Sequence, residues 1–341
     1  MVPPRVLEAF GWSDAAHVPI TMGLINETHR IEARDGRQFV LQRLHPVFGA
    51  EVNLDIEAVT LHLASCGLTT PRLVRTRQGA LHVLDDEQRA WRALTFIEGR
   101  CVGEIRSPSL ARAAGAMAGR FTRATHGLAH TFAFTRSGVH DTQAHLTKLA
   151  RLSATSHGDQ LAETRALAAE LLAHARELPP LEDLPLRIVH GDLKASNVLF
   201  EHDRDEAVCL IDLDTLAHGT VATELGDALR SWTNPRGEDD TRGEVDEALF
   251  AAAVEGYLTE AGGVLAPSER TVFARGLETI ATELAARFCA DAFEDRYFGW
   301  NRDRYPSRRA HNLTRARSQL SLARSARAKR DALEAIAARS G

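Results

Sequence analysis

The chain has 341 residues, of which 44% are apolar and 26% are charged, a composition typical of a soluble globular protein large enough for two lobes around one cleft. Its formal net charge of −5 argues against nucleic acid as a partner, because nucleic-acid-binding proteins normally carry a basic surplus. No apolar run approaches the ~20 residues that span a membrane, and the N-terminus lacks the layout of a secretory signal. The four cysteines form no Cys-x-x-Cys pair, so we expect a reduced, cytoplasmic protein with no membrane partner.

The N-terminal part of the chain is predicted to be rich in strands. Residues 28–33 and 38–44 alternate in polarity on either side of an Asp-Gly turn, which indicates a β-hairpin. Apolar residues at helical spacing follow over 51–65, so a helix is expected there. Residues 73–97 then return to a strand pattern interrupted by turn residues.

Beyond Gly99 the composition changes to Ala- and Leu-rich segments with helical spacing. We expect helices over residues 108–126, 141–154, 158–178, 220–232, 243–262 and 267–293. The basic tail, residues 307–340, mixes Arg and Lys with Glu and Ala and has no Phe, Tyr or Trp. This favours a solvated helix packed on the large lobe over a membrane-surface helix. The fold class is therefore predicted as α+β, with a small β-rich lobe (1–98), a large helical lobe (99–341) and a hinge at 96–99.

The most informative segment, residues 186–214, contains two apolar strands that each deliver polar side chains to one region. Asp192 follows the first strand, Lys194 and Asn197 come soon after it, and the second strand ends in Asp212. Phosphoryl transfer needs one carboxylate to orient the attacking hydroxyl, and an amide oxygen and a second carboxylate to hold magnesium against the nucleotide phosphates. Asp192, Asn197 and Asp212 fit these roles in that order. Lys194 adds a cation near the transferred group, and although His-Gly-Asp alone is a common turn, the complete string predicts a kinase-like site.

The string HGDLKASN, followed by IDLD, resembles the catalytic and metal-binding loops of the aminoglycoside phosphotransferase and choline kinase superfamily, distant relatives of the protein kinases. The resemblance implies a two-lobed, protein-kinase-like fold, with ATP and Mg²⁺ as cofactors. From about Gly23 to about Gln319 the chain is also similar to the N-acetylhexosamine 1-kinases, which transfer the γ-phosphate of ATP to the anomeric hydroxyl of N-acetylglucosamine or N-acetylgalactosamine. This narrower resemblance rests on the segments GLINETHRI, FVLQRLHPVFGAEVNL, AWRALTFIEG, IDLDTLAHG, ELGDALR, RFCADAFEDRYF and YPSRRAHNLTRARSQ.

Residues 22–28 precede the hairpin, at the place where a kinase-like lobe covers the nucleotide phosphates with backbone amides. Gly23, Asn26 and Thr28 are the candidate nucleotide-binding residues of this loop. Adenine is expected to pair with the backbone of the hinge, at Phe96, Ile97 and Glu98.

Protein kinases carry a lysine on the third strand of the small lobe to hold the α- and β-phosphates. The comparable strand here, residues 39–43, reads FVLQR and has no lysine. The N-acetylhexosamine 1-kinases also have Leu-Gln at this place. The missing lysine is therefore a departure from the superfamily, but it agrees with the narrower family. Arg43 is the candidate cation, as a planar fork rather than a point charge, and Glu57 on the following helix is its expected partner.

The resemblance places the acceptor contacts on the late helix and the segment after it. Arg287 and Asp291 are four residues apart, so they project from one helix face. An Arg and a Tyr at these places contact the acetamido sugar in the N-acetylhexosamine 1-kinases, which implies the same roles for Arg287 and Tyr297. Asp214, the second acid of IDLD, is expected to bind a second magnesium ion or to orient the sugar.

The chain departs from the narrower family at Leu24, where that family has a histidine that also reaches the sugar. Losing a hydrogen bond around which a site is built changes discrimination between substrates by orders of magnitude. The expected acceptor is therefore a hexosamine or hexose, with N-acetylglucosamine, another hexose, an amino sugar and an unacetylated analogue all left open. His190 is expected to brace the catalytic turn, and Asp227 and Arg230 the catalytic loop.

Two alternatives stay open on sequence alone. A kinase of another alcohol, such as choline, homoserine or an aminoglycoside antibiotic, needs an acidic acceptor site when its substrate is cationic. The late helix region offers charges of both signs, namely Glu283, Asp291, Glu294, Asp295, Arg287 and Arg296. A catalytically inactive kinase-like scaffold is favoured by the missing strand lysine and opposed by the complete set of catalytic residues. The sequence predicts a small-molecule partner and leaves the oligomeric state open.

Overall fold

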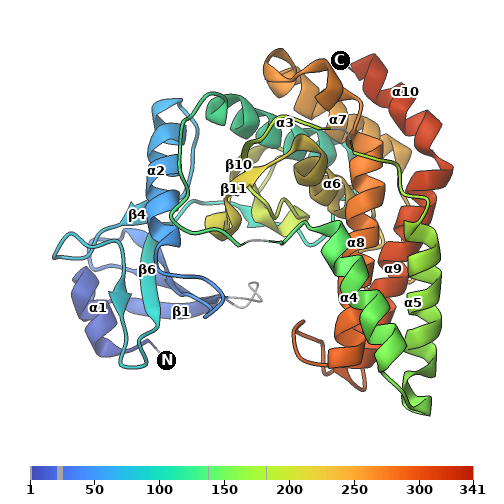
Figure 1. Cartoon of the computed structure of the whole chain (residues 1–341). Helices are drawn as coiled ribbons and strands as arrows, with labels where there is room; N and C mark the ends of the chain where they lie inside the picture. Colours follow the sequence, from blue (N-terminus) through green and yellow to red (C-terminus); the bar gives the residue numbers. More distant parts are fainter. Residues whose placement is uncertain (1, 21–25, 137, 182, 341) are drawn as a thin grey trace.

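The structure is a computed structural model that describes residues 2–20, 26–136, 138–181 and 183–340. Its N-terminal lobe contains one antiparallel sheet in the order β1-β2-β3-β6-β4, with β5 paired to β6. The elements of this lobe are α1 (Pro4–Phe10), β1 (Ala16–Ile20), β2 (Glu27–Glu32), β3 (Gln38–Arg43), α2 (Val52–Ser65), β4 (Leu73–Val74), β5 (Val83–Leu84) and β6 (Ala90–Thr95). Figure 1 shows this lobe on the left, beside the larger helical lobe.

The two faces of the N-terminal sheet have different neighbours because side chains alternate along a strand. Phe39 and Leu41 of β3 point to the face that α1 covers, where they are buried in one apolar cluster. Gln42 points to the opposite face, where its side chain bonds Arg92 on β6 and Arg92 in turn reaches Asp214 of the second lobe. The predicted hairpin is thus present, and the polar face of its second strand is turned toward the helical lobe.

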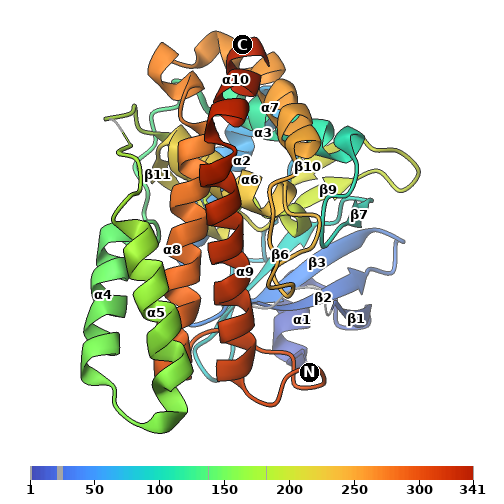
Figure 2. The same cartoon turned by 90° about the vertical axis from the view of Figure 1, so that its right-hand side faces the viewer.

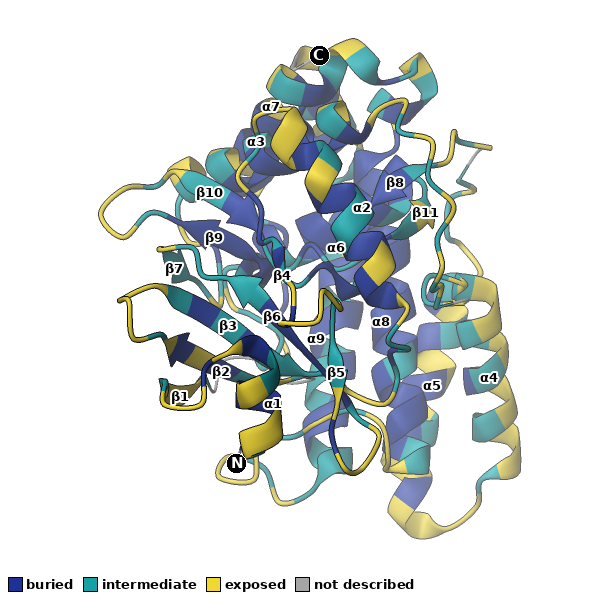
Figure 3. Ribbon diagram, turned by 90° about the vertical axis from the view of Figure 1, so that its left-hand side faces the viewer, coloured by how far each residue is buried: buried dark blue, intermediate teal, exposed yellow. Residues whose placement is uncertain are grey.

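The second lobe consists of helices around short strands. Its helices are α3 (Pro108–Thr125), α4 (Thr142–Thr155), α5 (Ala162–Ala175), α6 (Val221–Trp232), α7 (Glu247–Ala261), α8 (Phe273–Glu294), α9 (Arg308–Ala328) and α10 (Arg330–Ser340). Its strands are β7 (Arg100–Cys101), β8 (Arg187–Val189), β9 (Val198–Phe200), β10 (Ala207–Leu210) and β11 (Ala217–Gly219). Helices α4, α5, α8 and α9 lie side by side in Figure 2, and α8 contacts each of the other three. Figure 3 shows α8 mainly buried and the outer sides of α4 and α5 exposed.

The predicted α+β class with a β-rich N-terminal lobe and a helical C-terminal lobe is confirmed. Two helix predictions are wrong in detail. The helix expected from residue 267 begins at Phe273, after a separate 3₁₀ turn at Pro267–Arg270, and the basic tail is broken at Lys329 into α9 and α10. The strands β1, β7, β9 and β11 were not predicted, because two- to five-residue strands carry too few side chains for a periodic signal. No helix in the described parts of the chain is long and apolar enough to cross a membrane.

Helices α3 and α7 cross at glycines, which lets their backbones approach closely. A Cβ atom added at Gly115 would lie 2.0 Å from the carbonyl oxygen of Ala253, and one added at Gly256 would lie 2.2 Å from that of Arg112. Neither carbonyl belongs to a flexible side chain, so a methyl group could be fitted only by moving the two helices apart.

We expect Gly115→Ala to destabilise the protein by about 1–3 kcal/mol, since overpacking at this crossing outweighs the higher helix propensity of alanine. Gly263→Ala is the matched control, because a Cβ at Gly263 meets no atom within 4 Å in the described structure. Denaturant unfolding measures both variants. A Gly115→Ala protein as stable as the Gly263→Ala control would contradict the close approach.

Candidate active site

The backbone of the loop that carries Asp192 is fixed where β8 ends. Gly191 has φ 78°, and a Cβ atom there would lie 2.5 Å from the carbonyl oxygen of Thr215, so the position requires glycine. The buried carboxylate of Glu224, on α6, accepts the backbone N–H groups of His190 at 2.8 Å and Gly191 at 2.9 Å. Burial raises the pKa of Glu224 to about 7, against the lowering effect of these two N–H groups. Glu224, which the sequence prediction missed, therefore fixes the backbone of this loop through two hydrogen bonds.

Asp192 lies at the end of this turn and is held by the two polar side chains predicted to accompany it. Lys194 donates to Asp192 Oδ2 at 2.6 Å, and the amide of Asn197 donates to the same oxygen at 3.0 Å and to the Asp192 carbonyl at 2.8 Å. Burial by itself would raise the pKa of Asp192, but the Lys194 ammonium and its hydrogen bond lower that pKa below its ordinary value. Asp192 is thus an anion at neutral pH.

Asp212 is brought next to this group by bonds between the two loops. The Ile211 N–H donates to the Asn197 carbonyl at 2.9 Å, and His190 Nε2 lies 2.9 Å from the Ile211 carbonyl. Asp212 itself has φ 64°, a left-handed conformation that is uncommon for a residue other than glycine. Burial and the neighbouring carboxylate of Asp214 raise the pKa of Asp212 to about 6.

The chemistry of this pair of loops fits a divalent cation. No donor from the described residues forms a hydrogen bond to the Asp212 carboxylate, although it lies near the further carboxylates of Asp192 and Asp214. Asn197 uses only its Nδ2 group within the loop, which leaves its Oδ1 oxygen as a second ligand. A carboxylate and an amide oxygen are ligands that Mg²⁺ accepts, and a cation here would relieve the crowding of negative charge.

Arg92, which the sequence prediction missed, links the two lobes at this site. Its side chain is 1% exposed and forms an ion pair with Asp214, whose other oxygen accepts from the Asn26 amide at 2.7 Å. Arg92 Nε and Nη2 both donate to Gln42 Oε1, at 3.0 and 2.7 Å. Asp214 was predicted to bind a second magnesium ion or the sugar, but in this structure both of its oxygens are engaged by side chains of the N-terminal lobe. A charged residue in the middle of an apolar strand was the available signal, because such a residue requires a partner.

The prediction that Arg43 pairs with Glu57 is wrong. Arg43 lies 3.0 Å from Asp85, 2.5 Å from Glu87 and 3.8 Å from Glu27. Glu57 instead pairs with Arg75 at 2.9 Å. Adjacent strand residues point to opposite faces, so Arg43 is turned away from the face on which Gln42 and Arg92 meet.

The other candidate nucleotide residues fall in three places. Gly23 lies outside the described residues, as does Leu24, which was predicted to belong to the acceptor site. Thr28 is on β2, where its hydroxyl oxygen accepts a bond from the Gln42 amide at 3.3 Å. The predicted hinge residues, Phe96, Ile97 and Glu98, lie in the connection between β6 and β7.

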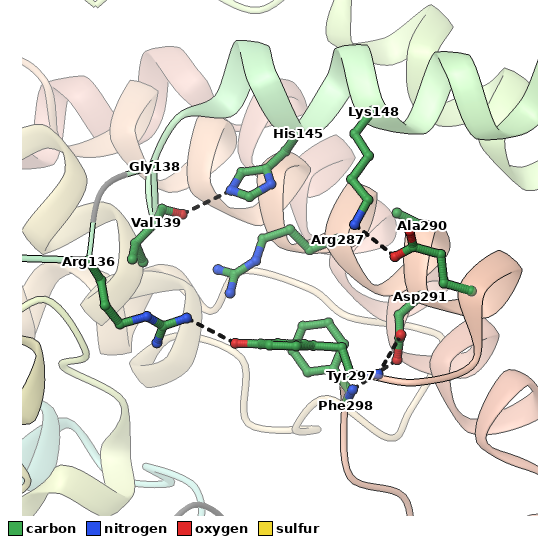
Figure 4. A pocket seen from close by; sticks show the side chains of 11 residues that line it. Arg136, Gly138, Val139, His145, Lys148, Arg287, Ala290, Asp291, Tyr297 and Phe298 are labelled. Carbon is green, nitrogen blue, oxygen red and sulfur yellow. Dashed lines mark hydrogen bonds and ion pairs between the residues drawn. The ribbon is translucent and has the colours of Figure 1, made fainter. Parts of the chain in front are cut away.

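The late helix and the loop after it line a cavity of about 210 Å³ that also contacts α4 and the loop before it. Arg287 points into this cavity, while Arg136 reaches across from the opposite side and donates to the Tyr297 hydroxyl at 3.1 Å (Figure 4). Arg287 meets a carboxylate oxygen of Glu283 only at 4.0 Å, and its guanidinium lies 5.8 Å from the centre of the Phe298 ring. Two guanidinium groups thus face the cavity from different elements.

The carboxylates around this cavity are already engaged. Asp291 accepts the backbone N–H groups of residues 296–298 and the Asn312 amide, so it closes the end of α8. Glu294 pairs with Lys148 at 2.8 Å and with Arg296 at 3.0 Å. Glu283 is bound by His140 at 3.1 Å and by the Thr142 hydroxyl at 2.7 Å.

The two-lobed fold and the arrangement of side chains around Asp192 and Asp212 are those expected of a kinase-like phosphotransferase. Residues 17–267 match the model of the phosphotransferase enzyme family, and the chain belongs to this family.

Solved structures with the same fold cover almost the whole chain. A microcompartment-associated aminopropanol kinase is 15% identical, with a TM-score of 0.66 and 97% of each chain covered. An aminoglycoside phosphotransferase from Alicyclobacillus acidocaldarius is 18% identical, with a TM-score of 0.62 over 98% of this chain and 97% of that one. The amicoumacin kinase hAmiN, solved with AMP-PNP, Ca²⁺ and its ligand Ami, is 17% identical, with a TM-score of 0.60 over 92% and 89%. At these identities the likeness concerns the fold.

Proposed function

We propose that the protein is an ATP- and Mg²⁺-dependent small-molecule kinase that phosphorylates the anomeric hydroxyl of a hexosamine or hexose. The carrying observation is the arrangement of Asp192, Lys194, Asn197 and Asp212 in one braced pair of loops. We further propose that residues 1–98 form the nucleotide-binding lobe and residues 99–341 the lobe that carries the catalytic loop and the acceptor site.

In the proposed reaction Asp192 accepts the proton of the acceptor hydroxyl. The hydroxyl oxygen forms a bond to the γ-phosphorus of ATP as the bond from that phosphorus to the bridging oxygen breaks, and ADP leaves. Both side-chain bonds to Asp192 use Oδ2, so Oδ1 is left for the acceptor. An anomeric hydroxyl is more acidic than an ordinary alcohol, so a carboxylate of lowered pKa is a sufficient base.

The nucleotide and metal roles follow from the same geometry. Asp212 and Asn197 Oδ1 would hold Mg²⁺, whose charge offsets that of the phosphates as the phosphoryl group moves. Lys194 would lie beside the transferred group and keep Asp192 ionised. Phe96, Ile97 and Glu98 would present their backbone groups to adenine.

We assign the acceptor to the cavity lined by Arg136, Arg287 and Tyr297. Guanidinium and phenol groups suit an acceptor rich in hydroxyl and carbonyl oxygens, such as an acetamido sugar. Each carboxylate among the described lining residues is already paired or hydrogen-bonded. None is therefore left to bind a polycationic antibiotic or a quaternary amine. This charge pattern supports the sugar acceptor over the choline-like or aminoglycoside alternative.

A panel of acceptors in a coupled ADP-release assay tests the proposal. N-acetylglucosamine, N-acetylgalactosamine, glucosamine, galactose, choline, homoserine and kanamycin are compared at equal concentration, and phosphorus NMR of the product identifies the esterified hydroxyl. We expect turnover of a hexosamine or hexose to its 1-phosphate. Turnover of only choline, homoserine or kanamycin would refute the sugar assignment, and failure of AMP-PNP to bind would refute the kinase assignment.

We expect Arg287→Met to raise the acceptor KM by about 10- to 100-fold, because a charge-assisted hydrogen bond to the sugar is lost. The KM for ATP should stay unchanged. Arg302→Met is the matched control, since Arg302 is exposed, follows the same helix and does not line the cavity. Steady-state kinetics with each substrate varied measures both variants, and an unchanged acceptor KM in Arg287→Met would remove this cavity from the acceptor site.

A further inference from the structure

The small lobe lacks the strand lysine of the lysine–glutamate ion pair that normally holds the nucleotide phosphates in kinases, and the glutamate on its helix has a different partner. Gln42 stands on β3 where a lysine is expected. Glu57, the acid on the following helix α2, is bound to Arg75. An enzyme that uses a nucleoside triphosphate still requires a cation near the α- and β-phosphates, so another residue must supply it.

The strand register identifies where such a cation stands. β3 and β6 are antiparallel neighbours, and Gln42 lies directly opposite Arg92. Directly opposed residues project from the same face of a sheet, so the Arg92 side chain occupies the space beside the missing lysine. From there it reaches Asp214, two residues after the proposed metal ligand Asp212.

The bonds of Arg92 hold its guanidinium in one orientation. Gln42 Oε1 accepts from both Nε and Nη2, and the Gln42 amide is itself fixed by donation to Thr28 on β2. Three of the five guanidinium donors are engaged by Gln42 and Asp214, which leaves two for a further acceptor. An ion pair buried this deeply adds little to stability compared with apolar packing, so stability alone does not account for it.

The arginines on the two strands of the hairpin, β2 and β3, are unsuited to this task. Arg43 is on the opposite face, surrounded by Asp85, Glu87 and Glu27. Arg30 shares the face of Gln42, but it lies opposite Val40, one pleat closer to the hinge, and is exposed. Arg92 alone among these three is fixed beside the metal-binding loop.

We propose that Arg92 supplies, from β6, the cation that binds the α- and β-phosphates of the nucleotide. Gln42 orients the guanidinium, and Asp214 plays the part of the helix glutamate by pairing with it across the two lobes. Closing the lobes on a nucleotide thereby joins the phosphates, Arg92 and the IDLD loop in one network. The inference rests on the proposed kinase function and adds a phosphate-binding residue to it.

The test compares binding of Mg²⁺–AMP-PNP and of adenosine by calorimetry in the wild type, Arg92→Gln, and the double variant Gln42→Lys/Arg92→Gln. We expect Arg92→Gln to bind AMP-PNP about 10- to 100-fold more weakly, with adenosine affinity unchanged, because adenosine has no phosphate. The double variant returns an ammonium to β3 and should recover part of the loss. Arg75→Gln, which breaks an ion pair in the same lobe, is the control and should bind like the wild type.

Three results would overturn the proposal: wild-type AMP-PNP affinity in Arg92→Gln, an equal loss for adenosine and AMP-PNP, or no recovery in the double variant. Arg92→Lys, which keeps the charge beside Asp214, replaces Arg92→Gln if the neutral variant does not fold, and it should show a smaller loss confined to AMP-PNP. Because no acceptor is added, a wild-type protein that fails to bind AMP-PNP would refute the kinase function itself. A failure confined to the variants refutes only the role of Arg92.

Discussion

Replacing Asp192 by asparagine is expected to lower kcat by about 10²–10⁴-fold, the usual contribution of a general base. The amide has nearly the same shape as the carboxylate but cannot accept the proton of the acceptor hydroxyl. Lys194 and Asn197 donate to Asp192 Oδ2 and can still donate to an amide oxygen, so the loop should keep its conformation. AMP-PNP affinity is therefore expected to stay close to that of the wild type.

Asp203→Asn is the matched control for this experiment. Asp203 is an exposed acid in the connection between β9 and β10, so its replacement removes the same charge without touching the site. Single-turnover kinetics with saturating ATP isolates the chemical step from product release. A near-normal single-turnover rate in Asp192→Asn would exclude Asp192 as the base.

The proximity of the proposed catalytic residues could be predicted from the sequence because they are close together in the chain and follow strands. Asp192, Lys194 and Asn197 lie within six residues, and hydrogen bonds between neighbouring residues then place them together. Arg92 and Asp214 could not be paired in this way, since 122 residues separate them and only the lobe arrangement brings them into contact. The alternation of side chains along β3 predicts that Arg43 and Gln42 lie on opposite faces of the sheet. It does not predict which of these faces contacts the second lobe.

The proposed acceptor region was harder to interpret. The sequence shows which charged residues are present, but not which of them are already paired or hydrogen-bonded within the protein. Asp291 was predicted to line the acceptor site beside Arg287, and it does border the cavity. Its oxygens, however, accept three backbone N–H groups from the chain that turns back after α8. Backbone donors at a helix end have no signature in side-chain spacing. The same holds for Glu224, whose partners are the N–H groups of a loop more than thirty residues earlier.

Replacing Asp212 by asparagine is expected to lower kcat by roughly 10²–10³-fold and to weaken the dependence of the rate on Mg²⁺, since metal charge supplies several kcal/mol of transition-state stabilisation. The variant also removes a carboxylate from the crowded group around Asp192 and Asp214. Its thermal stability at neutral pH should therefore be equal to or above that of the wild type. Loss of activity together with retained stability would distinguish a metal ligand from a structural acid.

The pH dependence of Mg²⁺ binding tests the role of Asp212 independently of the kinetics. The pKa of Asp212 is raised to about 6 in the absence of metal, so the carboxylate is protonated below that pH and ionised above it. Mg²⁺ binds the ionised form, and its apparent affinity in the presence of AMP-PNP should fall as pH is lowered through about 6, with a proton released on binding. The Asp212→Asn variant should lose this pH-dependent step. If the affinity of the variant for Mg²⁺ fell by the same factor over this pH range, the titrating group would be another residue. That result would exclude Asp212 as the carboxylate that binds the metal.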